Sequence, residues 1–475
     1  MARAKLSILN LDEIERINAI SIRILENIGV SIRSKSVCKL LERYGCIPSK
    51  NGKRMLIPEN VVKQAVSSAP KSSILLAARD KKYDMMIPSD KRTYMANGGE
   101  GVYVKNLLTG ESHSSTLKDT IDFFILSERM PQVDFVWVMV GAIEQPPHVK
   151  ELAEMRTCYE HTNKHLMGGA LSAEQAKDMI DIASILSGGR DEMEKRPIYS
   201  AVQCPISPLT FEKGIVEGQV ELARAKVPVV AMSAPIAGIT SPVTLSGTVA
   251  QTTAENLASL VIVQAARKGA PFIFSSDSST ADMSTGSIDY GGMESPLLHS
   301  ACGQMGRFYC LPTMCNGASI EEASIYLGNV QEGVPLMFPE TLIQSDLGSG
   351  FGGIDNALGA SLEQFMVDAW VWDLAREFAR TFDTDEDAIS YETIQKVAEG
   401  SSYLSQVHTI KRFKKEIISA TRPEMSPIER DKLEKRGSLI KKAQKEAIRI
   451  LKEPRKSLLA KDESKELESF FSKFK

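Results

Sequence analysis

The sequence has few cysteines and no long apolar run. Its seven cysteines are scattered over 475 residues without a Cys-x-x-Cys pair, which is typical of reduced thiols and not of a disulfide framework. The longest apolar stretches, such as residues 135–143, are far shorter than the ~20 residues of a membrane-spanning helix. The first residues are charged, so no secretory signal is expected. These absences predict a cytoplasmic protein.

An excess of positive charge is also lacking. The formal net charge is -3, so no basic field exists that would hold nucleic acid or an anionic membrane. Only His161 and His165, of six histidines, have a spacing that could place two ligands on one helix face, and we expect no metal site. No G-x-G-x-x-G segment opens the first helix of the alternating region, which disfavours a dinucleotide-binding fold. With 43% hydrophobic and 25% charged residues, the chain is expected to be an ordinary globular protein with a substantial core.

Residues 1–72 are expected to form a helical N-terminal segment. Asn10 and Glu13 are spaced as a capping box, and Gly29 supplies a left-handed exit from a helix over residues 10–28. Further helices are predicted over residues 34–44 and from Pro58 onward. Residues 73–114 change to short β-type runs separated by Asp, Asn and Gly, which predicts a small β region.

Residues 115–400 alternate between continuous apolar runs and segments of helical period. Such alternation predicts a parallel sheet buried on both faces, and its length favours a (β/α)8 TIM barrel. Seven strands are expected, and an eighth could come from residues 93–97. The seven predicted strands are residues 135–143, 166–171, 198–204, 228–236, 271–276, 311–316 and 341–345.

Residues 401–475 are rich in Lys, Glu and Arg and are expected to form a helical C-terminal extension. The segment 428–451 has helical period. It is predicted to be a surface helix or an arm onto a neighbouring subunit, so a homo-oligomer is expected.

In a barrel of this kind, reacting groups come from the carboxyl ends of the strands and from the loops that follow. The predicted strand ends carry no nucleophile elbow, no histidine and no lysine that could form an imine, which disfavours an aldolase or lyase. Two segments at these ends are expected to be functional loops: the polar stretch 275–286 and the glycine-rich stretch 346–353.

Several segments resemble the trimethylamine methyltransferase family, in order along nearly the whole chain. The resemblance lies in residues 97–111 (NGGEGVYVKNLLTGE), 204–211 (CPISPLTF), 235–248 (PIAGITSPVTLSGT), 282–286 (DMSTG) and 304–312 (QMGRFYCLP). It implies a (β/α)8 barrel whose mouth receives the corrinoid of a small partner protein. The protein itself is then expected to bind no cofactor tightly.

Founding members of that family carry pyrrolysine at the active site, whereas this sequence has only standard residues. The corresponding position falls within residues 331–335, with Val334 the closest match. Related members without pyrrolysine act on quaternary amines such as glycine betaine. The resemblance therefore implies methyl transfer from a quaternary amine, glycine betaine first, to the cob(I)alamin of a corrinoid protein in one-carbon metabolism of the methanogenic or acetogenic kind.

This reaction requires little acid–base chemistry. Cobalt(I) displaces a neutral tertiary amine from a cation, so no acid has to protonate the leaving group. Quaternary ammonium groups are commonly held by aromatic faces, and Trp137 and Tyr290 are among the aromatics near predicted strand ends. The alternatives left open are another methylated amine (proline betaine, carnitine or trimethylamine) and a corrinoid- or amine-binding barrel without turnover.

The predicted site residues fall into three groups. Predicted catalytic residues are Asp346, Gln344 and Val334. Predicted substrate-binding residues are Tyr94, Tyr103, Gln203, Phe274, Asn316 and Phe351. Predicted corrinoid-facing loop residues are Gly98, Gly99, Asp282, Gly348 and Gly350.

Overall fold

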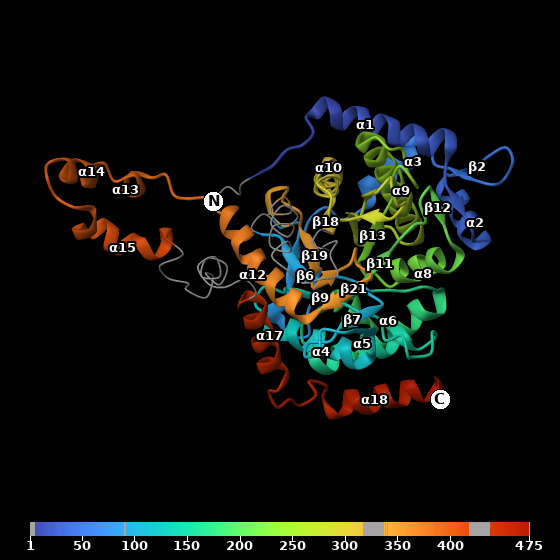
Figure 1. Ribbon diagram of the computed structural model, residues 1–475. Helices are drawn as coiled ribbons and strands as arrows, with labels where there is room; N and C mark the ends of the chain where they lie inside the picture. Colours follow the sequence, from blue (N-terminus) through green and yellow to red (C-terminus); the bar gives the residue numbers. More distant parts are fainter. Residues whose placement is uncertain are drawn as a thin grey trace.

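The protein is described by a computed structural model that covers residues 5–89, 92–316, 337, 339, 341–417 and 438–474 (Figure 1). Eight parallel strands form one sheet in the order β6-β19-β18-β15-β13-β11-β10-β9. This confirms the predicted (β/α)8 barrel. The strands are β6 (Tyr94–Asn97), β9 (Phe135–Trp137), β10 (His165–Gly169), β11 (Tyr199–Gln203), β13 (Val229–Ser233), β15 (Phe272–Ser276), β18 (Thr313–Asn316) and β19 (Leu347–Phe351).

The last strand lies later in the chain than predicted. Thr341 and Leu342 are helical, and the strand β19 begins only at Leu347. The prediction of a strand over residues 341–345 is therefore wrong, because a short apolar run fits a buried helix turn as well as a buried strand. The glycine-rich stretch that was predicted to be a loop is the strand itself, followed by β20 (Gly353–Ile354).

Side chains join β6 to β9, where the barrel closes. The Asn97 amide accepts a hydrogen bond from the Trp137 backbone N–H at 3.0 Å and donates to the Trp137 carbonyl oxygen. Nearer the amino ends of the same two strands, the Asp134 carboxylate accepts a hydrogen bond from the Met95 N–H at 3.0 Å, and the Asp134 N–H donates to the Met95 carbonyl at 2.7 Å. These pairs take the place of a regular strand ladder and fix the position of Trp137.

Helices cover the outside of the barrel. They are α4 (Leu117–Arg129), α5 (Lys150–His161), α6 (Ala173–Ser187), α8 (Lys213–Arg224), α9 (Leu245–Ala266), α10 (Glu294–Phe308) and α12 (Leu362–Phe378). Helix α9 is buried on every side from Thr248 to Gln264, so a further layer must cover its outer face.

The N-terminal helices provide that layer. They are α1 (Leu11–Arg23), α2 (Lys35–Tyr44) and α3 (Glu59–Ser68), and all three pack on α9. Asn10 and Glu13 form the predicted capping box, and Gly29 has the predicted left-handed backbone with φ 69°. The helical N-terminal layer is confirmed.

Two small sheets lie beyond the carboxyl ends of the barrel strands. One contains β7 (Tyr103–Lys105), β8 (Ser112–Ser114), β20 and β21 (Gly359–Ser361). The other contains β14 (Ile236–Ala237), β16 (Ser279–Ala281) and β17 (Ile288–Asp289). The polar stretch 275–286 is thus partly a strand and not an irregular loop.

The C-terminal part is helical. Helix α17 (Ser438–Leu451) buries Ala443, Ala447 and Ile450 in a core shared with α12, so it packs on its own barrel. Helices α13 (Glu386–Ile389), α14 (Tyr391–Ala398) and α15 (Val407–Glu416) stand apart from the barrel in Figure 1. Among the described residues, no helix combines the length and the apolar character that crossing a membrane demands.

Candidate active site

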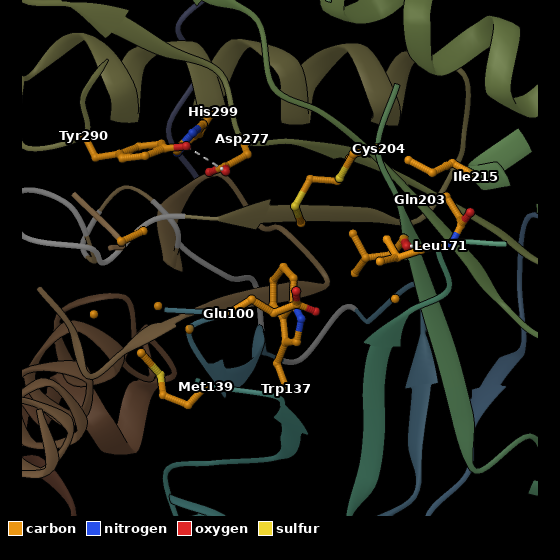
Figure 2. Close-up of a pocket in the computed structure, with 18 of the residues that line it drawn as sticks. Glu100, Trp137, Met139, Leu171, Gln203, Cys204, Ile215, Asp277, Tyr290 and His299 are labelled. Carbon is orange, nitrogen blue, oxygen red and sulfur yellow. Dashed lines mark hydrogen bonds between the residues drawn. The ribbon is translucent and has the colours of Figure 1, made fainter. Parts of the chain in front are cut away.

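A cavity of about 280 Å³ lies at the carboxyl ends of the barrel strands (Figure 2). Residues that end or follow six of the eight strands contribute to its wall, which is the position expected for the active site of a barrel enzyme. Its main polar and aromatic lining residues are Glu100, Trp137, Gln203, Cys204, Asp277, Tyr290 and His299.

Glu100 enters the cavity from an unusual backbone conformation. Its φ is 53°, in the left-handed region that residues with a side chain rarely adopt, and its N–H donates to the Val138 carbonyl at 2.9 Å. The side chain is accessible within the cavity, yet the surrounding protein is dense enough to desolvate it and to raise the pKa of its carboxyl group. Strained backbone of this kind is concentrated at functional sites.

Trp137 lies at the end of β9 with its indole in the cavity wall. The ring occupies the space next to Gly99: a Cβ at residue 99 would stand 2.7 Å from the ring. The indole N–H is buried and has no hydrogen-bond partner within the described residues. The absence of a side chain at Gly99 therefore allows the indole ring to occupy the cavity wall.

Asp277 and Tyr290 face Glu100 and Trp137 from the other side of the cavity (Figure 2). The Tyr290 hydroxyl donates to the Asp277 carboxylate at 3.1 Å. The negative charge of Asp277, together with burial, raises the pKa of Tyr290 far above its usual range, so the phenol stays protonated. The pair adds a second carboxylate and a second aromatic ring to the cavity.

Gln203 and His299 add hydrogen-bond acceptors. The Gln203 amide donates from Nε2 to the carbonyls of Ala170 and Val202, which leaves its buried Oε1 without a donor. The buried Nε2 of His299 likewise lacks a partner within the described residues. Desolvation lowers the pKa of His299 to about 4, so the ring is neutral near pH 7.

Cys204 lines the same cavity but is not activated. Its thiol is accessible within the cavity, and yet desolvation raises its pKa to about 12. A thiol with this pKa is protonated near pH 7 and is a weak nucleophile. Among the described residues, no group of three or more His, Cys, Asp or Glu side chains is arranged to hold a metal ion.

Four of the residues predicted from the sequence meet at the cavity: Gly98, Gly99, Gln203 and Gly350. Gln344 and Asp346 precede β19 and therefore lie at the opposite end of the barrel. The length of the five-residue strand, about 16 Å, separates them from the cavity. Asp346 accepts hydrogen bonds from the backbone N–H groups of Ser89 and Thr313 at 2.6 and 2.8 Å. Asp346 thus joins the amino ends of the strands. It was predicted at the opposite end of the barrel because the last strand was placed too early in the chain.

Of the candidate aromatic residues, Trp137 and Tyr290 line the cavity, whereas the aromatic residues predicted to bind substrate lie outside it. Tyr94 begins β6, where the Arg92 guanidinium lies 4.8 Å from its ring centroid. Phe274 faces α10 near Gly306, and Phe351 packs against Phe365 of α12 at 6.3 Å between ring centroids. Both rings are on the outer surface of the sheet.

The remaining predicted residues are more peripheral. The Tyr103 hydroxyl donates to Asp355 at 2.9 Å. Asp282 closes an exposed turn through Ser284 and Thr285, and Gly348 is within β19. Val334 and the side chain of Asn316 lie outside the described residues.

Glu100 and His299 were not predicted to be site residues, and Asp277 was predicted only as part of the functional stretch 275–286. The sequence did carry a signal for Glu100, because it lies among three glycines at residues 98, 99 and 101, shortly after the predicted strand 93–97. His299 carries no such signal, since it lies in the second turn of α10 and reaches the cavity only through the packing of that helix on the barrel.

A family model described as "Trimethylamine methyltransferase (MTTB)" matches residues 2–475. A glycine betaine methyltransferase of Desulfitobacterium hafniense (strain Y51) is 28% identical over 88% of this chain and 86% of its own length. A trimethylamine methyltransferase, MttB, of Methanosarcina barkeri is 26% identical over 85% of this chain and 82% of its own length.

A solved structure shares the fold at low identity. The monomethylamine methyltransferase (MtmB) of Methanosarcina barkeri has a TM-score of 0.50 and 11% identity over 92% of this chain and 91% of its own. This likeness supports the barrel architecture alone. The family model, which spans almost the whole chain, shows that the protein belongs to the trimethylamine methyltransferase family.

Proposed function

We propose that this protein transfers a methyl group from a quaternary ammonium compound to the cobalt(I) of a corrinoid carried by a partner protein. The observation that carries the proposal is the cavity itself, which presents two carboxylates and two aromatic rings at the carboxyl ends of the barrel strands. Its position is that of a barrel active site, and this lining suits an organic cation. Family membership supports the reaction class.

The reaction balances without a protein acid or base. The N–CH3 bond breaks with both electrons going to nitrogen, and a neutral tertiary amine leaves. Cobalt(I) supplies the electron pair of the new bond and becomes methyl-cobalt(III). The protein then has to desolvate the cation, align one methyl group with the mouth of the barrel and exclude water.

The lining residues suit these tasks. The faces of Trp137 and Tyr290 can hold the methylated nitrogen, an interaction that strengthens when water is removed. Glu100 and Asp277 supply negative charge on opposite sides of the cavity. The hydrogen bond from Tyr290 to Asp277 orients the ring without removing that charge.

The test is a spectral assay with a reduced corrinoid protein. Glycine betaine is the first substrate to try, because it is named in one relative, and a panel of other quaternary amines follows. We expect conversion of cobalt(I) to methyl-cobalt(III) that depends on both the enzyme and one quaternary amine. If no quaternary amine supports conversion while a tertiary amine or a non-amine methyl donor does, the proposal is wrong.

The pH dependence of substrate binding should report Glu100. A quaternary ammonium carries fixed charge, so any titration belongs to the protein. The pKa of Glu100 is raised by desolvation, and the carboxyl is neutral below that pKa and negative above it. KM should therefore fall as pH rises through that pKa, and Glu100→Gln should flatten the profile. An unchanged profile in the variant would contradict this role.

A further inference from the structure

Residues 380–417 form an arm that extends from the barrel and contains α13, α14 and α15 (Figure 1). These helices have 4, 8 and 10 residues, and isolated helices shorter than ~12–15 residues are marginal in water. In the described part of the chain, no residue of the arm is buried. The arm therefore has no core of its own, and its helices need another surface to pack against.

The surface of the arm is rich in exposed apolar side chains. Leu404 is 85% exposed and Ile410 is 63% exposed. Four further large apolar side chains of the arm are at least 60% exposed: Phe382, Ile389, Tyr391 and Val407. Single exposed apolar residues are ordinary, but a concentration of this kind marks an interaction surface.

Ion pairs join the two limbs of the arm, which are α13–α14 and α15. Arg412 of α15 pairs with Asp387 of α13 and lies 3.6 Å from the Asp383 carboxylate, with which Lys415 also pairs. Exposed ion pairs contribute at most about 1 kcal/mol each. These contacts fix how the limbs lie against each other but do not replace an apolar core.

A groove of about 770 Å³ lies between the two limbs, and Ile389, Tyr391 and Val407 are in its wall. The arm thus has both a groove and, in Leu404 and Ile410, protruding apolar side chains. Such a surface can pair with an identical surface, because each copy supplies the side chains that fill the groove of the other. This is the arrangement of a two-fold interface.

The charges of the arm favour the same partner. Helices α13 and α14 together contain three acidic residues and one basic residue, whereas α15 contains four basic residues and one acidic residue. If α15 of each copy faces α13 and α14 of the other, opposite charges meet across the interface. The whole arm has six basic and seven acidic residues, so two arms do not repel each other through net charge.

We propose that the arms of two copies of this chain pair around a two-fold axis, with Leu404 and Ile410 of each copy in the groove of the other. Interfaces that are permanent are the more apolar ones. A corrinoid carrier suits this surface less well, because it has to leave after each methyl transfer; this one argument rests on the proposed function. A second copy of the chain is present whenever the arm has to be covered.

Sedimentation velocity of the complete protein tests the pairing. We expect a species of at least twice the mass of one chain at micromolar concentration. Ile410→Glu should raise the dissociation constant about a hundredfold and leave a monomer, because a two-fold interface buries the introduced carboxylate twice. Ile47→Glu is the matched control: Ile47 is 54% exposed on β2 (Ile47–Pro48), away from the arm, and this variant should keep the mass of the unmodified protein.

Hydrogen exchange locates the interface. The backbone amides of α14 and α15 should be protected in the unmodified protein and should exchange at least tenfold faster in Ile410→Glu. The amides of the barrel strands should keep their protection, which would show that the variant is folded. Leu404→Glu should behave as Ile410→Glu does. Methyl transfer per chain should persist in both variants, because the arm does not line the cavity.

Three results would overturn the proposal. A monomeric unmodified protein with protected arm amides would show that the same chain covers the arm. A monomer that gains mass only with the corrinoid protein, and loses that complex in Ile410→Glu, would assign the arm to the carrier. An unchanged mass in both Ile410→Glu and Leu404→Glu would place the contact between copies on another surface.

Discussion

Replacing Trp137 with leucine should raise KM for a quaternary ammonium substrate about thirtyfold. The indole is buried in the cavity wall, and a desolvated cation–π contact is worth ~2 kcal/mol, which corresponds to that factor. Steady-state kinetics of methyl-cobalt formation measures the change.

Trp137→Phe is the matched control, because it keeps an aromatic face and loses the indole N–H. We expect its KM to remain within a few-fold of the unmodified enzyme. A leucine variant that melts normally and shows an unchanged KM would remove Trp137 from the substrate site. Equal losses in both variants would assign the effect to the N–H donor and not to the ring.

Replacing Lys164 with methionine should lower the free energy of unfolding by roughly 3 kcal/mol, because each buried polar group that loses its partner costs about 1–3 kcal/mol. Lys164 is 1% exposed, and its ammonium donates to the carbonyl oxygens of Ser127, Met130 (3.0 Å) and Val133 (2.7 Å). Desolvation of the ammonium offsets part of the loss. Denaturant unfolding measures the difference, and the exposed Lys39→Met on α2 should change it little.

The pH dependence of stability gives an independent readout of Lys164. Desolvation lowers its pKa in the folded protein to about 8, below the ordinary lysine value of 10.5. Between these two values the unfolded chain binds more protons, so stability attributable to this group rises with pH across that window. Lys164→Met should lose this rise. A variant that retains both the stability and the pH dependence would show that the lysine is not structurally important.

Much of the fold could be predicted because its signals are local. The capping residue Asn10 and the exit at Gly29 fixed the first helix, and the alternation of apolar runs with helical segments indicated the barrel. The position of the last strand was predicted wrongly for a physical reason. The sequence LGSGF of β19 has little β propensity and forms a strand only because its neighbours supply the pairing, whereas the apolar residues before it fit a strand better in isolation.

The site was harder to predict than the fold. Because the last strand was predicted too early in the chain, Gln344 and Asp346 were expected at the carboxyl end of the barrel, whereas they lie at its amino end. Strands of a barrel are buried on both faces, so their sequence does not show which residues point outward, and Phe274 and Phe351 were assigned inward although they face helices. Glu100 reaches the cavity through a left-handed backbone, which a sequence pattern does not report.

The central claim is that the cavity delivers a methyl group from a quaternary nitrogen to cobalt. The most direct test uses a quaternary ammonium substrate carrying N-CD3 groups, with mass spectrometry of the corrinoid and of the protein after one turnover. The predicted result is CD3 on cobalt and a tertiary amine that has lost one CD3 group. Label found on a protein side chain such as Cys204, or an intact labelled amine beside unmethylated cobalt(I), would contradict the claim.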